Sequence, residues 1–164
     1  MSNIAPQDQR TFFVTAVTAG GKNLLQSSRM ADLLLDVLHY YRKEGRFQIH
    51  EFVIMPNHFH SIVTPASDVS LEKAMQFIKG GFSFRAKREL GCQFEIWERS
   101  FTEHRIKDCE DYDRHRSYIY ENPVRAGLAM KAQDYAYGSA RVTSLIDARP
   151  PWLKPSSTAA FSQG

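Results

Sequence analysis

The sequence predicts an α+β fold of the ferredoxin-like, split βαβ type, in which a four-stranded antiparallel sheet carries helices on one face. Segments rich in β-branched and aromatic residues alternate with segments whose apolar residues recur at helical spacing. Their order along the chain is strand, helix, strand, strand, helix, strand, helix, as this fold requires. The length of 164 residues is enough for one domain with a buried core.

The first half of the chain supplies three strands and one helix. The segment RTFFVTAVTAG predicts a strand that ends at a glycine pair. Ser27 or Ser28 can cap a helix that ends at Gly45 and carries one apolar stripe, made of Met30, Leu33, Leu34, Val37, Leu38 and Tyr41. The segments RFQIHEFVIM and HFHSIVTP predict two further strands, and Pro56-Asn57 between them predicts a hairpin turn.

The second half supplies two helices and the fourth strand. Ser70 can cap a helix that runs towards Gly91 with the apolar stripe Leu71, Ala74, Met75 and Ile78. The Gly80-Gly81 pair inside this helix predicts a bend or a close approach to another backbone. The segment CQFEIWERSFTEHRI predicts the fourth strand, and Asp108 with the acidic residues after it predicts the start of a third helix.

The C-terminal residues differ in composition from the rest of the chain. After Ser144 the sequence LIDARPPWLKPSSTAAFSQG is rich in proline and small residues. We therefore expect one domain over residues 1–144 and a Pro-rich tail over residues 145–164, with Trp152 packed against the domain.

Composition excludes several classes of protein. No apolar run approaches the roughly 18 residues that a membrane-spanning helix needs, and the N-terminal segment MSNIAPQDQR lacks the apolar core of a signal peptide. Cys92 and Cys109 are the only cysteines and form no C-x-x-C pair, so neither a disulfide framework nor a zinc knuckle is indicated. We expect a cytoplasmic protein without a membrane partner.

Basic and aromatic residues are interleaved in the neighbouring segments KGGFSFRAKREL and WERSFTEHRIK. A formal net charge of +3 is compatible with a polyanionic partner but does not identify one. Mixed cations and aromatic rings suit single-stranded nucleic acid, because phosphates attract positive charge and unstacked bases pack on flat apolar surfaces. The alternative is a solvated helix face above core phenylalanines. The candidate DNA contacts are Lys79, Arg85, Arg88 and Arg105.

Two histidines follow the hairpin turn with one phenylalanine between them. Because side chains alternate along a strand, His58 and His60 lie on the same face, and Phe59 lies on the other. Two neighbouring imidazoles can chelate one divalent ion. The alternative is a solvated or base-stacking pair on an outer sheet face.

The segment SYIYENPVRAGL offers a nucleophile and a third ligand. Tyr118 and Asn122 are four positions apart, so on a helix they share one face. The phenol of Tyr118 could attack a phosphodiester near a metal held by His58, His60 and Asn122. The alternative is a helix junction, in which Asn122 caps a short next helix that begins with Pro123.

Three segments together, VIMPNHFHSIV, WERSFTEHRIKDCEDYDRHRSYIYENPVRAGL and YGSAR, resemble the REP-associated tyrosine transposases, a branch of the single-tyrosine HUH transposases. The resemblance runs from about Thr11 to Arg141. It implies an HUH nuclease fold, cleavage and rejoining of single-stranded DNA at palindromic repeat hairpins through a covalent 5′-phosphotyrosine, and a need for Mg²⁺ or Mn²⁺.

Carried over residue by residue, the resemblance assigns His58 and His60 to the histidine pair, Tyr118 to the nucleophile and Asn122 to the third metal ligand. Tyr120 is the second choice for the nucleophile, and i and i+2 positions face different sides of a helix. We expect a monomer in preference to a homodimer. The alternatives are a domesticated hairpin-DNA-binding protein that does not cleave, and a metal-dependent phosphodiesterase that uses water.

Overall fold

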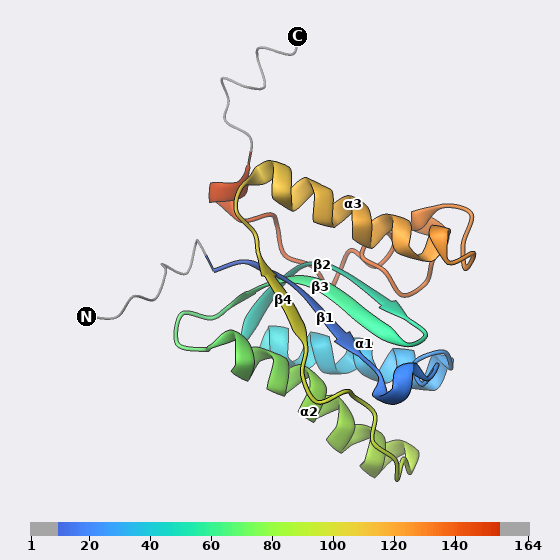
Figure 1. Ribbon diagram of the computed structural model, residues 1–164. Coiled ribbons are helices and arrows are strands. Elements are labelled where there is room, and N and C mark those ends of the chain that lie inside the picture. Colours follow the sequence, from blue (N-terminus) through green and yellow to red (C-terminus); the bar gives the residue numbers. More distant parts are fainter. Residues whose placement is uncertain (1–9, 155–164) are drawn as a thin grey trace.

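The computed structural model describes residues 10–154 and shows a four-stranded antiparallel sheet with three α-helices (Figure 1). The strand order across the sheet is β2-β3-β1-β4, so the predicted α+β, ferredoxin-like fold is confirmed. In chain order the elements are β1 (Phe12–Val17), α1 (Ser28–Lys43), β2 (Phe47–Met55), β3 (His58–Pro65), α2 (Leu71–Leu90), β4 (Thr102–Arg105) and α3 (Cys109–Arg125).

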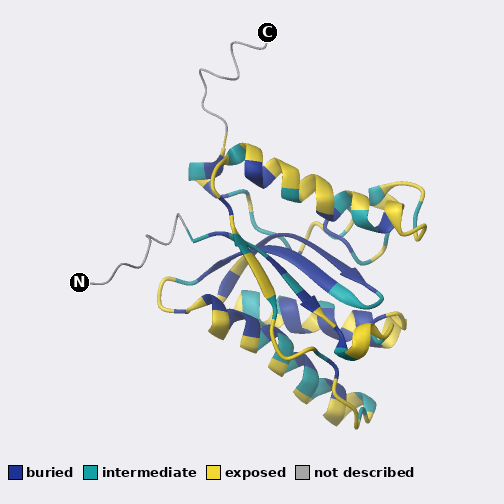
Figure 2. Ribbon diagram, viewed as in Figure 1, coloured by how far each residue is buried: buried dark blue, intermediate teal, exposed yellow. Residues whose placement is uncertain are grey.

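Helices cover both faces of the sheet. α1 and α2 lie on one face, as predicted, whereas α3 lies across the opposite face (Figure 1). The physical reason is that β2 and β3 are buried on both sides, from Ile49 to Met55 and from Phe59 to Pro65 (Figure 2). Such strands have no face open to solvent and need a second covering layer. That layer is α3.

Each layer has its own apolar core. The larger core lies between the sheet and α1 and α2, and its fully buried members include Val14, Leu34, Phe52, Phe59 and Phe82. The smaller core lies between the sheet and α3, and consists of Val53, Met55, Ile62, Ile106, Tyr112, Ile119 and Leu153. The candidate site residues lie on the side of the smaller core.

The helix starts agree with the sequence. Ser27, Ser70 and Asp108 each occupy the N-cap position and accept a hydrogen bond from a backbone N–H three residues later. The glycine pair of α2 produces no break in the helix. Instead, a Cβ atom on Gly81 would lie 2.7 Å from the ring of Tyr41, so glycine permits the close packing of α1 against α2.

The fourth strand is shorter than predicted. Residues 102–105 form a continuous ladder with β1, whereas most of the segment before them is irregular and joins the end of β1 through the N–H of Glu98, which donates to Val17 at 2.8 Å. Trp97 explains the difference, because its ring packs against Phe82 at 5.7 Å and its Nε1 donates to the carbonyl oxygen of Lys79. These contacts hold the segment against α2, so it meets the edge of the sheet only at an isolated bridge between Trp97 and Thr18 and the backbone hydrogen bonds beside it.

The C-terminal segment packs along the outer edge of β2 as far as it is described. The backbone N–H of Ile54 donates to Tyr137, and that of Ser139 donates to Phe52, at 2.8 and 2.9 Å. Leu145 and Leu153 are buried, and Trp152 is partly buried against the smaller core. Residues 145–154 therefore lie on the domain, and the rest of the expected tail lies outside the described residues. No described helix has the length and apolar character needed to cross a membrane.

Candidate active site

The two histidines lie side by side on β3, facing α3. Their ring centroids are 4.6 Å apart. His60 is buried, and its Nδ1 is hydrogen-bonded to the hydroxyl of Thr15 at 2.8 Å. Burial, followed by the positive charge of a protonated His58, lowers the pKa of His60 to about 3, so its imidazole is neutral at physiological pH. Its Nε2 atom is buried without a hydrogen-bond partner.

The hydrogen bonds of Asn57 fix the tautomer of His58. Asn57 donates through Nδ2 to the carbonyl oxygen of Gly21, so its Oδ1 accepts from Nδ1–H of His58 at 2.7 Å. The Nε2 of His58 then carries a lone pair and lies 3.3 Å from Oδ1 of Asn122. Two acceptors face each other, which is stable when a cation lies between them or when the Asn122 amide is turned to donate.

Tyr118 and Asn122 lie on the face of α3 that approaches the histidines. The ring centroid of Tyr118 is 5.3 Å from that of His60 and 6.0 Å from that of Phe13, and Phe13 stacks on His60 at 5.2 Å. Tyr118 is 41% exposed, so a large ligand can reach its hydroxyl. The structure thus brings together the four residues predicted from the sequence.

Tyr120 lies on a different side of α3 and has other partners. The guanidinium carbon of Arg116 lies 5.0 Å from its ring centroid, and Arg116 also pairs with the buried carboxylate of Glu51. Burial, followed by the charge of Glu51, raises the pKa of Tyr120. These contacts give Tyr120 a packing role, which favours Tyr118 as the reactive tyrosine.

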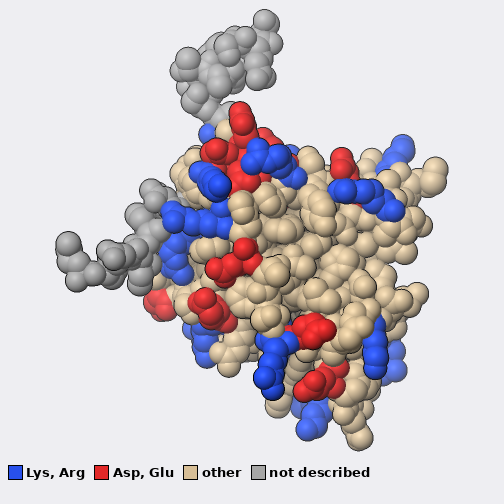
Figure 3. All heavy atoms as spheres, viewed as in Figure 1, with Lys and Arg blue, Asp and Glu red and all other residues tan. Residues whose placement is uncertain are grey.

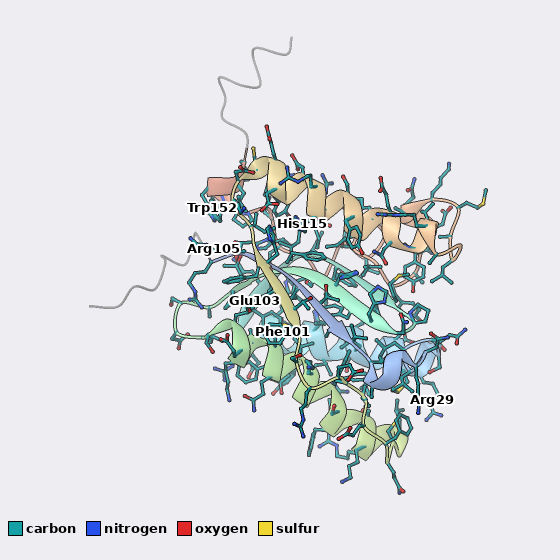
Figure 4. All side chains as sticks on the ribbon, viewed as in Figure 1. Arg29, Phe101, Glu103, Arg105, His115 and Trp152 are labelled. Carbon is teal, nitrogen blue, oxygen red and sulfur yellow. The ribbon has the colours of Figure 1, made fainter. Side chains whose placement is uncertain are left out.

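The four candidate DNA contacts lie away from the histidines. Lys79, Arg85 and Arg88 are on α2, on the opposite face of the sheet from α3. Lys79 donates to two backbone carbonyl oxygens, and Arg85 is paired with two carboxylates, whereas Arg88 is largely exposed. Arg105 is at the end of β4 (Figure 4). Acidic and basic side chains are intermingled on the face that Figure 3 shows.

A second polar cluster was not predicted from the sequence. The ligand atoms of His104, Asp111 and His115 lie within 4.8 Å of one another, a spacing that could hold a metal ion. However, both oxygens of Asp111 already accept hydrogen bonds, from His104, Arg114 and the backbone N–H of Lys107. The cluster therefore joins β4 to the first two turns of α3, on which Figure 4 labels His115. Its only sequence signal was the four-residue spacing of Asp111 and His115.

Comparisons with known proteins identify relatives of this chain. Residues 11–122 match the family described as transposase IS200-like. A REP-associated tyrosine transposase from Escherichia coli K12 is 27% identical over 130 residues, which are 79% of this chain and 75% of that protein. A Haemophilus influenzae protein of the same family name is 30% identical over 133 residues, covering 71% of this chain and 76% of that protein.

Solved structures give the same result. A REP-associated tyrosine transposase bound to a REP hairpin superposes with a TM-score of 0.68 and 26% identity, covering 94% of this chain and 89% of that one. A crystal structure described as a transposase from Deinococcus radiodurans shares the fold, with a TM-score of 0.52 and 15% identity over 74% of this chain and 95% of that one. The chain belongs to the IS200-like transposases, in their REP-associated tyrosine transposase branch.

Proposed function

We propose that this transposase cleaves and rejoins single-stranded DNA through a covalent 5′-phosphotyrosine formed on Tyr118. The observation that carries the proposal is the position of the exposed Tyr118 ring beside His60, whose buried Nε2 has no hydrogen-bond partner. A buried lone pair without a partner is costly unless the site takes a ligand. The exposed phenol of Tyr118 therefore lies beside the buried imidazole of His60, whose Nε2 is available to a ligand.

The polar atoms of the site fit a divalent metal ion. Nε2 of His60, Nε2 of His58 and Oδ1 of Asn122 would be its ligands, because the first is buried without a hydrogen-bond partner and the other two lie 3.3 Å apart beside it. Nitrogen and amide-oxygen ligands suit Mn²⁺, and Mg²⁺ is the other candidate. When bound, the ion would neutralise charge on the scissile phosphate. Thr15 and Asn57 would fix the two ring orientations through the Nδ1 atoms.

The proposed reaction exchanges one phosphodiester bond for another. The hydroxyl oxygen of Tyr118 attacks the phosphorus atom after losing its proton, and a bond forms between them. The bond from phosphorus to the 3′ oxygen of the departing strand breaks, and that oxygen takes up a proton. A 3′-hydroxyl can later attack the phosphotyrosine and release Tyr118, so strands are rejoined without nucleotide hydrolysis.

We propose that the substrate is hairpin DNA with a single-stranded flank. Support comes from the solved relative, which is bound to a REP hairpin. Lys79, Arg85, Arg88 and Arg105 remain candidate phosphate contacts on surfaces away from Tyr118. We also propose a monomer, because the C-terminal segment covers the edge of β2, one of the two sheet edges through which strands of a second chain could pair. A substrate of chromosomal repeats would place the protein in the bacterial cytoplasm.

The test is a denaturing gel of the protein incubated with labelled hairpin DNA and Mn²⁺ or Mg²⁺. Wild type and Tyr120→Phe should form a protein–DNA adduct, and Tyr118→Phe should not. Loss of the adduct in Tyr120→Phe alone would transfer the role to Tyr120. Cleavage without an adduct would indicate a phosphodiesterase that uses water, and binding without cleavage would indicate a hairpin-binding protein.

A further inference from the structure

Arg125 lies beside the proposed nucleophile. Tyr118 and Arg125 are separated by two turns of α3, so their side chains share a face of the helix. The guanidinium carbon of Arg125 is 5.1 Å from the ring centroid of Tyr118. Arg125 also pairs with Glu121 at 3.5 Å, and both of these side chains are more than half exposed. Such a pair is weak, so an incoming anion can displace Glu121.

The protein ligands of the site carry no permanent charge. The set consists of the two imidazoles of His58 and His60 and the amide of Asn122, and none of these groups can carry a negative charge. Within residues 10–154, the cation that contacts the ring of Tyr118 is Arg125. A phosphodiester brings negative charge to this position, and stabilisation of that charge is the main requirement of phosphoryl transfer.

We propose that Arg125 is a further catalytic residue, which binds the scissile phosphate beside Tyr118 and stabilises the negative charge on it during attack. The inference rests on the proposed role of Tyr118. A guanidinium that stacks on an aromatic ring keeps the N–H groups at its edge free to donate to phosphate oxygens in pairs. Arg125 stays protonated throughout, so it supplies hydrogen bonds and charge but no proton.

A second arginine–tyrosine pair on the same helix shows what a structural role looks like. Arg116 lies over Tyr120 at nearly the same distance, 5.0 Å, but it also pairs at 3.4 Å with Glu51, whose side chain is only 8% exposed. That buried carboxylate neutralises Arg116. Among the described residues, Arg125 has only an exposed carboxylate for a partner. The difference in partners assigns packing to one pair and phosphate binding to the other.

The test measures adduct formation in single-turnover conditions, with hairpin DNA and Mn²⁺ at saturation. The variants are Arg125→Gln, Arg125→Lys and the control Arg29→Gln. Arg29 is exposed at the start of α1, on the opposite face of the sheet from α3, so its substitution removes the same charge on the other side of the sheet from Tyr118 (Figure 4). We expect Arg125→Gln to lower the maximal rate of adduct formation about 100-fold. The rate of Arg125→Lys should lie between those of wild type and Arg125→Gln, and that of Arg29→Gln should stay within about twofold of wild type.

Two results would overturn the role of Arg125. One is a maximal rate for Arg125→Gln within about threefold of wild type. The other is a loss confined to DNA affinity, because a general electrostatic contact weakens binding and its salt dependence without changing the rate at saturation. Coincident unfolding curves would show that the variant is folded. If wild type itself forms no adduct on Tyr118, the proposed function fails as well, whereas an undiminished adduct in Arg125→Gln rejects Arg125 alone.

Discussion

The glycine pair of α2 allows the packing of the two long helices to be tested with an adjacent control. A Cβ atom built on Gly81 would lie 2.7 Å from Cε2 of Tyr41 and 3.2 Å from its hydroxyl oxygen. The Tyr41 ring cannot move away freely, because it stacks on Phe77 with centroids 4.9 Å apart. A Cβ atom on Gly80 would instead meet Cγ of Gln76 at 3.8 Å, which is an ordinary contact.

We therefore expect Gly81→Ala to destabilise the protein and Gly80→Ala to stabilise it. Both variants gain up to about 1 kcal/mol, because alanine is favoured over glycine inside a helix. Only Gly81→Ala introduces an overlap in a packed interface, and overpacking costs about 1–3 kcal/mol. The free energy of unfolding should fall by about 1 kcal/mol in Gly81→Ala and rise by up to about 1 kcal/mol in Gly80→Ala.

The assay is equilibrium unfolding in urea followed by circular dichroism. The two variants should differ by about 2 kcal/mol, or by about 4–8 °C in thermal midpoint for a chain of this size. Adding Tyr41→Leu to Gly81→Ala should remove most of the penalty, which a double-mutant cycle measures. If both alanine variants shift the midpoint equally and in the same direction, Gly81 is not needed for the approach of α1 to α2.

Three further predictions concern the C-terminal segment and the site. Asp147→Asn should lower the free energy of unfolding by about 1–2 kcal/mol in urea titrations, because Asp147 accepts from the N–H of Ile49 and pairs with Arg42; an unchanged midpoint would contradict this. In metal-free protein, the pKa of His60 is about 3 in the folded state and 6.5 in the unfolded state, so between these pH values only the unfolded chain protonates this imidazole. Stability should therefore fall with decreasing pH across that window, by up to about 1.4 kcal/mol per unit from this group, and His60→Gln should flatten the slope in urea titrations; equal slopes would refute the assignment. Asn122→Leu should weaken Mn²⁺ binding at least about tenfold by calorimetry, and unaltered affinity would exclude Asn122 as a ligand.

Local patterns in the sequence were sufficient for most of the secondary structure. Three predicted caps, Ser27, Ser70 and Asp108, occupy their N-cap positions, because a cap depends only on residues within one turn. The common face of His58 and His60 follows from strand alternation, and that of Tyr118 and Asn122 from helical periodicity. Local geometry therefore predicted both halves of the site.

Features that depend on distant contacts were not predictable in the same way. Helical spacing was enough to pair Tyr118 with Asn122. The packing role of Tyr120, however, depends on the ion pair of its neighbour Arg116 with Glu51, and Glu51 belongs to β2, far from α3 in the sequence. The short fourth strand depends on contacts of Trp97 with α2. The position of α3 on the opposite face depends on the burial of β2 and β3 on both sides.

The apolar contacts of α3 also determine the geometry of the site. Ile119 is buried between α3 and the sheet, with Val53 and Ile62 in the same core. Its neighbour Tyr118 is therefore held at the edge of that core, beside His60, whose strand contributes Ile62 from the same face. A shift of α3 by one residue would expose Ile119 and turn Tyr118 away from the histidines. The burial of Ile119 thus fixes the rotation of α3 about its axis, and this rotation places Tyr118 rather than Tyr120 beside the histidines.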